Sequence, residues 1–128
     1  MKVLLDTHAF LWLMIDDPRL SATARATFQG INNELFLSLA SVWEMAIKAG
    51  LQKLKLPAPA RDYVVTRTKR HNIRLLDISL EHCSRVESLP FHHKDPFDRM
   101  IIAQAIIENL PILTDDKDFD SYAITKIW

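Results

Sequence analysis

Short apolar runs alternate with longer helix-forming segments along this chain, and this alternation restricts its fold more than any other feature. An apolar run without a polar face suits a strand inside a parallel sheet, because helices cover both sides of such a sheet. The sequence predicts strands at residues 3–5, 35–37, 74–78, 111–114 and 123–128, the last at an edge. Capping and breaking residues predict helices at residues 8–14, 21–29, 41–49, 61–71, 79–87 and 96–108. This alternation indicates an α/β fold with a mainly parallel sheet.

The length of 128 residues suits one domain, which we expect to span residues 1–128 without a repeat or a linker. The two glycines cannot build a glycine-rich phosphate loop, so P-loop and dinucleotide-binding fingerprints are excluded. The single cysteine, Cys83, excludes an internal disulfide and a cysteine-rich zinc site. Because the formal net charge is 0, an RNA-binding path requires local clusters of basic residues.

The N-terminus does not resemble a signal peptide, since only three apolar residues separate Lys2 from Asp6. The longest apolar stretch, residues 9–15, is too short to span a bilayer. We therefore expect a cytoplasmic protein without a membrane partner.

Acidic side chains that are far apart in the sequence are expected at one edge of this sheet. Asp6 follows the first strand, and Asp115 and Asp116 follow the fourth. A helix that leads into a parallel strand starts at the edge where the strands end, and Asp98 lies in the first turn of such a helix. Glu44 lies one turn into the helix after the second strand. Ligands of parallel α/β sheets bind beyond the carboxyl ends of the strands, so these acids are candidates for one site.

Carboxylates that are crowded into one depression repel each other and raise each other's pKa values. A divalent cation removes this conflict, and magnesium prefers a few carboxylates together with water and substrate phosphate. Water on such an ion loses its proton more easily and can attack a phosphodiester. The acids therefore indicate metal-dependent phosphodiester chemistry.

Structural interpretations of the same residues also fit. Ser41 and Glu44 match a capping box, in which the glutamate only caps a helix. Asp95 followed by Pro96 is typical of a helix start, and Asp98 is then favoured by the helix dipole.

The remaining acids and two histidines have similar alternatives. Asp6 fits the N-cap of the next helix, and the acids of residues 115–120 fit a solvated turn. The adjacent His92 and His93 are compatible with a transition-metal site, but such pairs in a loop are more often surface residues. The metal hypothesis gains weight because the acids fall on one sheet edge.

Four segments, in this order and spacing, carry a family resemblance. They are Leu4-Leu5-Asp6-Thr7-His8, Ser41-Val42-Trp43-Glu44, Asp95-Pro96-Phe97-Asp98-Arg99-Met100-Ile101-Ile102-Ala103-Gln104-Ala105 and Leu113-Thr114-Asp115-Asp116. Together they resemble the PIN-domain family, and most of all its toxin branch, the VapC-like ribonucleases of toxin–antitoxin pairs. The resemblance covers nearly the whole chain.

The resemblance implies a three-layer α/β/α fold with a five-stranded, mainly parallel sheet. It implies endonucleolytic cleavage of RNA that depends on Mg²⁺ or Mn²⁺. It also implies a cognate antitoxin protein, whose C-terminal segment lies in or beside the active groove. Many members of the family form dimers, so a homodimer is also expected.

Carried over by position, Asp6, Glu44 and Asp98 match the first three family acids, and Asp116 matches the fourth. The resemblance implies that these four residues are catalytic and bind the metal, with Asp6 and Asp98 as the main ligands. Asp115 is a rival for the fourth position.

Further residues near these motifs are secondary candidates. Asp95 lies about one turn before Asp98 and either assists the site or only caps the helix. Thr7 and Thr114 are expected to support the site by hydrogen bonds. Arg99 is expected either to contact substrate phosphate or to form a structural ion pair.

The first and third predicted helices contain more large apolar residues than a small core needs. We expect some of them to form an exposed groove for an antitoxin segment. These residues are Phe10, Leu11, Trp12, Met14, Trp43, Met45 and Ile47.

Three other functions fit parts of the sequence. A phosphoacceptor receiver domain, which is a regulatory module, has acids at strand ends and an acceptor that Asp77 resembles, but it leaves Glu44 and Asp98 without a role. A haloacid-dehalogenase-like phosphatase needs a second aspartate where this chain has His8. A related metal-dependent nuclease acting on DNA flaps usually carries additional DNA-binding elements.

Overall fold

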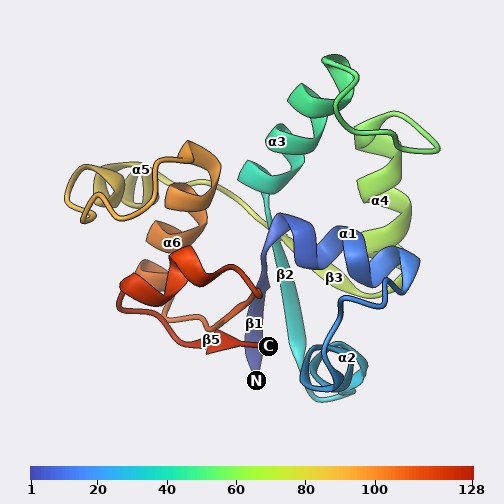
Figure 1. The fold of residues 1–128 in the computed structure, drawn as a ribbon, viewed down its shortest axis with the longest axis horizontal. Helices are drawn as coiled ribbons and strands as arrows, with labels where there is room; N and C mark the ends of the chain where they lie inside the picture. Colours follow the sequence, from blue (N-terminus) through green and yellow to red (C-terminus); the bar gives the residue numbers. More distant parts are fainter.

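The computed structural model describes all 128 residues, and its elements follow the predicted order (Figure 1). These elements are β1 (Lys2–Leu5), α1 (Thr7–Ile15), α2 (Ala22–Gln29), β2 (Glu34–Ser38), α3 (Leu39–Gly50), α4 (Ala60–Arg70), β3 (Ile73–Leu76), α5 (Leu80–Glu87), α6 (Pro96–Glu108), β4 (Ile112–Leu113), the 3-10 helix η1 (Lys117–Ser121) and β5 (Lys126–Ile127). The five predicted strands and six predicted helices are confirmed, and η1 is an addition to them. None of the helices has both the length and the apolar character needed to cross a membrane.

The sheet is entirely parallel, with the strand order β3-β2-β1-β4-β5. The chain builds it outward from β1 through β2 to β3 and then returns to the other side of β1 with β4 and β5. The direction of winding therefore reverses between β1 and β4, and ligands of such sheets bind at this reversal. Asp6 directly follows β1 and Thr114 directly follows β4, so both residues lie at this point.

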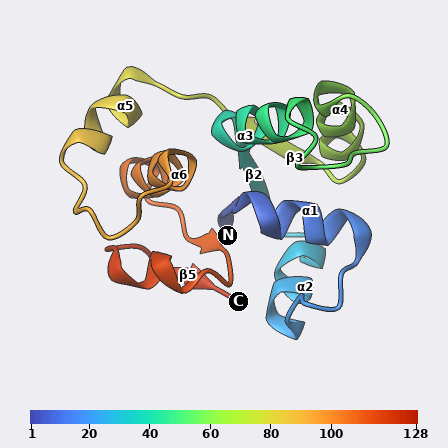
Figure 2. The same cartoon turned by 45° about the horizontal axis from the view of Figure 1, so that its top comes forward.

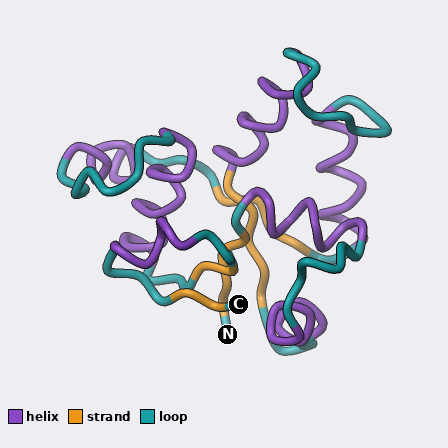
Figure 3. Tube along the Cα trace, viewed as in Figure 1, coloured by secondary structure: helices purple, strands orange, loops and turns teal.

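Helices cover both faces of the sheet and confirm the three-layer architecture (Figures 2 and 3). In Figure 2, α1, α2 and α4 lie to one side of the central strands, and α5 and α6 lie to the other. Val3 and Leu5 pack into the core on the α1 side, whereas Leu4 packs into the core on the α6 side. All three are fully buried, which explains why this strand has no polar face.

Helix α3 begins at Leu39, two residues earlier than the sequence indicated. Ser38 is its N-cap, and the Ser38 hydroxyl accepts a hydrogen bond of 3.0 Å from the backbone N of Ala40. Ser41 is instead buried inside the helix, where its hydroxyl accepts a hydrogen bond of 2.8 Å from Thr7 Oγ1. The capping-box interpretation of Ser41 and Glu44 is therefore wrong, and the Glu44 side chain is available for another role.

Asp95 and Asp6 stand at the starts of two other helices, but only Asp95 caps its helix with its side chain. Asp95 is the N-cap of α6, and its Oδ1 accepts hydrogen bonds from the backbone N atoms of Phe97 and Asp98 at 2.8 and 3.1 Å. Asp6 occupies the N-cap position of α1, but its side chain makes no capping hydrogen bond. The N-cap position predicted for Asp6 is therefore confirmed, but its carboxylate does not cap the helix and is available for the site.

Candidate metal centre

Asp6 is the buried centre of the candidate site, with only 3% of the residue exposed. Thr114 Oγ1 donates a 3.1 Å hydrogen bond to Asp6 Oδ2 and accepts one of the same length from the backbone N of Asp116. Thr114 therefore connects the acid after β1 to the segment after β4. Burial raises the pKa of Asp6 to about 6, although the nearby charge of His8 and the hydrogen bond from Thr114 oppose this shift.

Glu44 reaches the same site from the second turn of α3 and is also only 3% exposed. Its Oε2 accepts a 2.6 Å hydrogen bond from Lys48 Nζ, four residues further along the helix. Its Oε1 is buried and has no hydrogen-bond partner. Buried carboxylate oxygens are costly when unpaired, so this atom has the properties of a ligand that lacks its cation.

Asp98 shows that the predicted acids converge. Burial raises the pKa of Asp98 most, and together with the negative charges of Asp6, Asp95, Glu44 and Asp116 it brings this pKa to about 8. These groups lie directly after β1, within α3, at the start of α6 and after β4, so the sheet topology brings together acids that are more than a hundred residues apart.

The structure also separates Asp116 from its neighbour Asp115. Potential ligand atoms of Asp116, Asp98 and His93 lie within 4.8 Å of one another. Asp115 is exposed and has no part in this group. The geometry therefore favours Asp116 as the fourth acid.

His93 is the site residue to which the sequence interpretation gave too little weight, since it regarded the His92–His93 pair mainly as surface residues. His92 is exposed, as expected for a loop residue, but only 11% of the His93 side chain is exposed. His93 Nε2 lies 2.9 Å from Asp98 Oδ2 and 3.6 Å from Asp116 Oδ2. One signal was present in the sequence: His93 lies three residues before Pro96, where the helix that carries Asp98 begins, so it enters at the same sheet edge.

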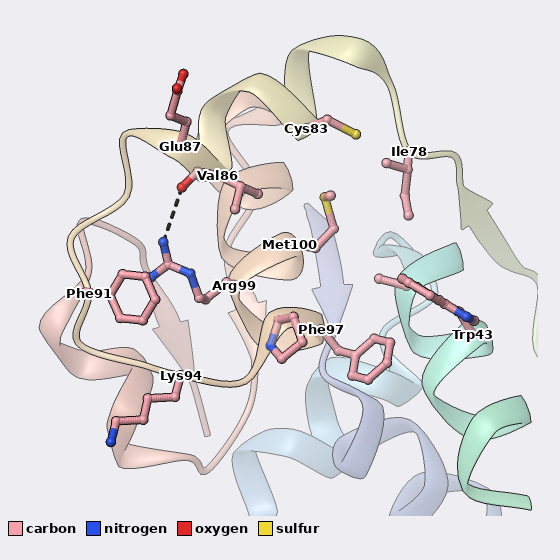
Figure 4. A pocket seen from close by; sticks show the side chains of 12 residues that line it. Trp43, Ile78, Cys83, Val86, Glu87, Phe91, Lys94, Phe97, Arg99 and Met100 are labelled. Atoms are coloured by element: carbon pink, nitrogen blue, oxygen red, sulfur yellow. Dashed lines mark hydrogen bonds between the residues drawn. The ribbon is translucent and has the colours of Figure 1, made fainter.

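Arg99 is not available for substrate phosphate, which corrects the sequence-based expectation. The residue is buried, and its guanidinium donates hydrogen bonds to backbone carbonyls rather than to a carboxylate. The contact with the carbonyl of Val86 is visible in Figure 4. Arg99 therefore holds together the chain between α5 and α6.

The donor set fits a hard divalent cation such as Mg²⁺ or Mn²⁺. Carboxylate oxygens predominate, several of them are buried, and Glu44 Oε1 lacks any partner. Asp77, the residue that resembled a receiver acceptor, is exposed after the edge strand β3, and its charge contributes to neither the Asp6 nor the Asp98 shift. This arrangement does not support the receiver alternative.

Some of the large apolar residues of α1 and α3 are exposed, as expected. Of the residues expected in an exposed groove, Phe10 and Met45 are fully buried, whereas Trp43 is 60% exposed and Ile47 is also exposed. A groove of about 330 Å³ between α1 and α3 is lined by both apolar and charged residues, including Trp12, Glu44 and Lys48.

A larger groove of about 560 Å³ lies between α3, α5 and α6, beside the loop that leads into α6 (Figure 4). Its lining is mainly apolar and includes Trp43, Val86, Phe97 and Met100. The rings of Trp43 and Phe97 meet edge to face, with centroids 5.1 Å apart. Below, this feature is called the α3–α6 groove.

The comparison with known proteins gives the family. The PIN domain matches residues 3–124, so the chain belongs to the PIN-domain family. It is 41% identical to ribonuclease VapC16 of Mycobacterium tuberculosis over 51% of this chain and 49% of that protein. It is 27% identical to ribonuclease VapC22 of the same organism over 94% of this chain and 91% of the relative.

A solved structure shares the fold across the whole chain. This is VapBC2 from Rickettsia felis bound to a DNA fragment from the promoter, with a TM-score of 0.73 and 17% sequence identity. The match covers 98% of this chain and 97% of that one. The PIN-like three-layer fold predicted from the sequence is therefore confirmed.

Proposed function

We propose that this protein is a metal-dependent endoribonuclease and the toxin of a type II toxin–antitoxin pair, with residues 1–128 forming a single nuclease domain. The observation that carries the proposal is the meeting of Asp6, Glu44, Asp98 and Asp116 at the reversal of the sheet. Membership of the PIN-domain family and the similarity to proteins named ribonucleases support the choice of RNA as substrate.

Asp6 and Asp98 are the proposed main ligands of Mg²⁺ or Mn²⁺, and Asp116 binds a second ion or orients water. When bound, the ion acts as a Lewis acid for the phosphodiester and lowers the pKa of water. Glu44 completes the ligand shell or accepts a hydrogen bond from the attacking water through its free Oε1. Thr114 holds Asp6 in one orientation throughout, because its hydroxyl is bonded on both sides.

The groove between α1 and α3 is the proposed path for RNA. Lys48, Lys53 and Arg19 line it, so positive charge lies next to the acids although the whole chain has a net charge of 0. Backbone phosphates bind mainly to such lysine and arginine side chains.

An antitoxin and a second copy of the chain are the proposed protein partners. The similar structures include several VapBC complexes, which supports an antitoxin segment at the apolar residues of α1 and α3, including Trp12 and Ile47. The α3–α6 groove is the proposed contact between two copies, because Trp43, Leu80 and Phe91 expose large apolar side chains in and beside it.

The catalytic proposal is tested with single-stranded RNA and DNA of the same sequence, in buffers with Mn²⁺, Mg²⁺ or a chelator. We expect the wild-type protein to cut RNA only with a metal ion. Asp6→Asn and Asp98→Asn should reduce the rate at least about 100-fold, because each removes a charge that binds the metal. Asp116→Asn should reduce it less, since that residue is more exposed.

Asp115→Asn is the matched control, since Asp115 adjoins Asp116 but lies outside the group of potential ligands. It should cut RNA at the wild-type rate. Asparagine has the shape of a protonated aspartic acid, so circular dichroism should show that all these variants are folded. Undiminished cleavage by folded Asp98→Asn would contradict the proposal, and preferred cleavage of DNA would favour the DNA nuclease instead.

A further inference from the structure

His93 is held in place by residues outside the group of acids. Its backbone N donates a 2.8 Å hydrogen bond to the hydroxyl of Tyr122. Its ring packs edge-on against Phe119, with centroids 5.8 Å apart. The backbone carbonyl of His93 also accepts a hydrogen bond from buried Arg99. These contacts therefore fix the imidazole independently of the carboxylates.

The orientation of the imidazole defines which nitrogen carries the proton. The backbone N of Asp95 donates a 3.2 Å hydrogen bond to His93 Nδ1, so Nδ1 is an acceptor. In a neutral imidazole the other nitrogen then carries the hydrogen. His93 Nε2 is therefore a donor, and it lies 2.9 Å from Asp98 Oδ2 and 3.6 Å from Asp116 Oδ2.

The Asp98 carboxylate faces this histidine. His93 is the basic side chain within 4.0 Å of the Asp98 carboxylate, which accepts no hydrogen bond from elsewhere in the chain. Buried His93 Nε2 forms no hydrogen bond of regular geometry with any group. The donor lies between two acids from different elements, at N···O distances of 2.9 and 3.6 Å.

On this basis, and assuming the proposed metal-dependent function, we propose that His93 is a positioning residue of the metal centre. In this role its Nε2–H holds Asp98 Oδ2 and leaves Asp98 Oδ1 free to bind the ion. Nε2 also faces Asp116 Oδ2, while Asp116 Oδ1 accepts a 2.9 Å hydrogen bond from the backbone N of Asp118. Outer-shell hydrogen bonds of this kind orient metal ligands, and their loss typically weakens metal affinity about 10–100-fold. Direct ligation by Nε2 is the competing arrangement, but it requires the proton to move to Nδ1, where the Asp95 N–H now points.

The test uses Mn²⁺ as the probe and electron paramagnetic resonance to measure its affinity for the full chain. We expect His93→Ala to bind Mn²⁺ about 10–100-fold more weakly than the wild-type protein. His93→Gln should recover most of the affinity, because its amide N–H reaches about as far as Nε2. His93→Asn should not recover it, because its shorter amide occupies the place of Nδ1.

His92→Ala is the matched control, since His92 is the adjacent histidine but is exposed and lies outside the acid group. It should bind Mn²⁺ like the wild-type protein. Thermal unfolding of each variant without metal separates a loss of affinity from a loss of fold. A purely structural role would give equal losses for His93→Gln and His93→Asn and would overturn the inference.

Spin-echo spectroscopy of Mn²⁺ bound to the wild-type protein tests the geometry without any substitution. We expect no coupling of the strength that a directly bonded nitrogen gives. Such a coupling would make His93 a ligand and overturn the positioning role, as would wild-type affinity in His93→Ala. Failure of the wild-type protein to bind Mn²⁺ would instead contradict the proposed function on which this inference rests.

Discussion

The buried carboxylate of Asp98 links the stability of the protein to pH and to metal. Burial and neighbouring charges raise its pKa from the ordinary value of 3.8 to about 8. Between these two values the folded protein binds more protons at Asp98 than the unfolded chain does. The free energy of unfolding therefore falls as the pH rises through this range. Metal binding opposes the effect because it stabilises the ionised carboxylate.

The first prediction is that the metal-free protein loses stability between pH 4 and pH 8 and regains it when Mn²⁺ is added at pH 8. Asp98→Asn should flatten the part of this pH dependence that comes from Asp98 and should respond much less to Mn²⁺. Urea denaturation at a series of pH values, with and without a chelator, measures both effects. Identical pH profiles for the wild type and Asp98→Asn would mean that Asp98 is already ionised in the metal-free fold.

At the scale of helices and strands, local sequence decided most of the site. Strand β1 is apolar on both faces and ends directly before the charged residue Asp6. The Asp95–Pro96 pair starts α6, which places Asp98 in the first turn of that helix. Parallel strand order then brings these ends together. The convergence of the acids was predictable because it depends on element boundaries and topology, not on details of side-chain packing.

Other features depend on tertiary contacts and were not predictable. His93 reaches the acids only because Arg99 binds the carbonyls of the loop between α5 and α6, including those of Leu89 and Pro90. Nothing in the local sequence reveals these contacts. The start of α3 was also not predictable from local sequence, because Ser38 and Ser41 are both good capping residues. The hydrogen bond between Thr7 and Ser41 holds Ser41 inside the helix, so Ser38 becomes the cap.

The second prediction distinguishes the roles of these two serines. Ser38→Ala should reduce the free energy of unfolding by about 1 kcal/mol, because it removes the N-cap of α3. Ser41→Ala should cost about 1–3 kcal/mol, because it leaves the buried Thr7 hydroxyl without its acceptor. When Thr7 is already replaced by Ala, the loss of unfolding free energy caused by Ser41→Ala should be smaller. The loss caused by Ser38→Ala should stay the same. Urea denaturation of the single and double variants measures this difference, and equal coupling of both serines to Thr7 would contradict it.

At the scale of the whole molecule, charge and apolar surface are distributed unevenly. The chain carries 16 basic and 16 acidic residues, yet acids gather at the reversal of the sheet and lysines line the adjacent groove. Large apolar side chains remain exposed around the α3–α6 groove, where Phe91 is 76% exposed. Because a zero net charge provides no general repulsion between copies, such a surface favours association.

The third prediction follows from this apolar surface. The protein should self-associate as its concentration rises, and Trp43→Ser or Phe91→Ser should shift it toward the monomer, because each removes a large apolar side chain from the α3–α6 groove. Analytical ultracentrifugation measures the shift, and Mn²⁺ affinity should stay unchanged. Ile31→Ser is the matched control, since Ile31 is 96% exposed but lies outside the groove. An equal effect of Ile31→Ser would mean that general surface hydrophobicity causes the association. A wild-type protein that stays monomeric at every concentration would contradict the proposal that the α3–α6 groove is a contact between copies.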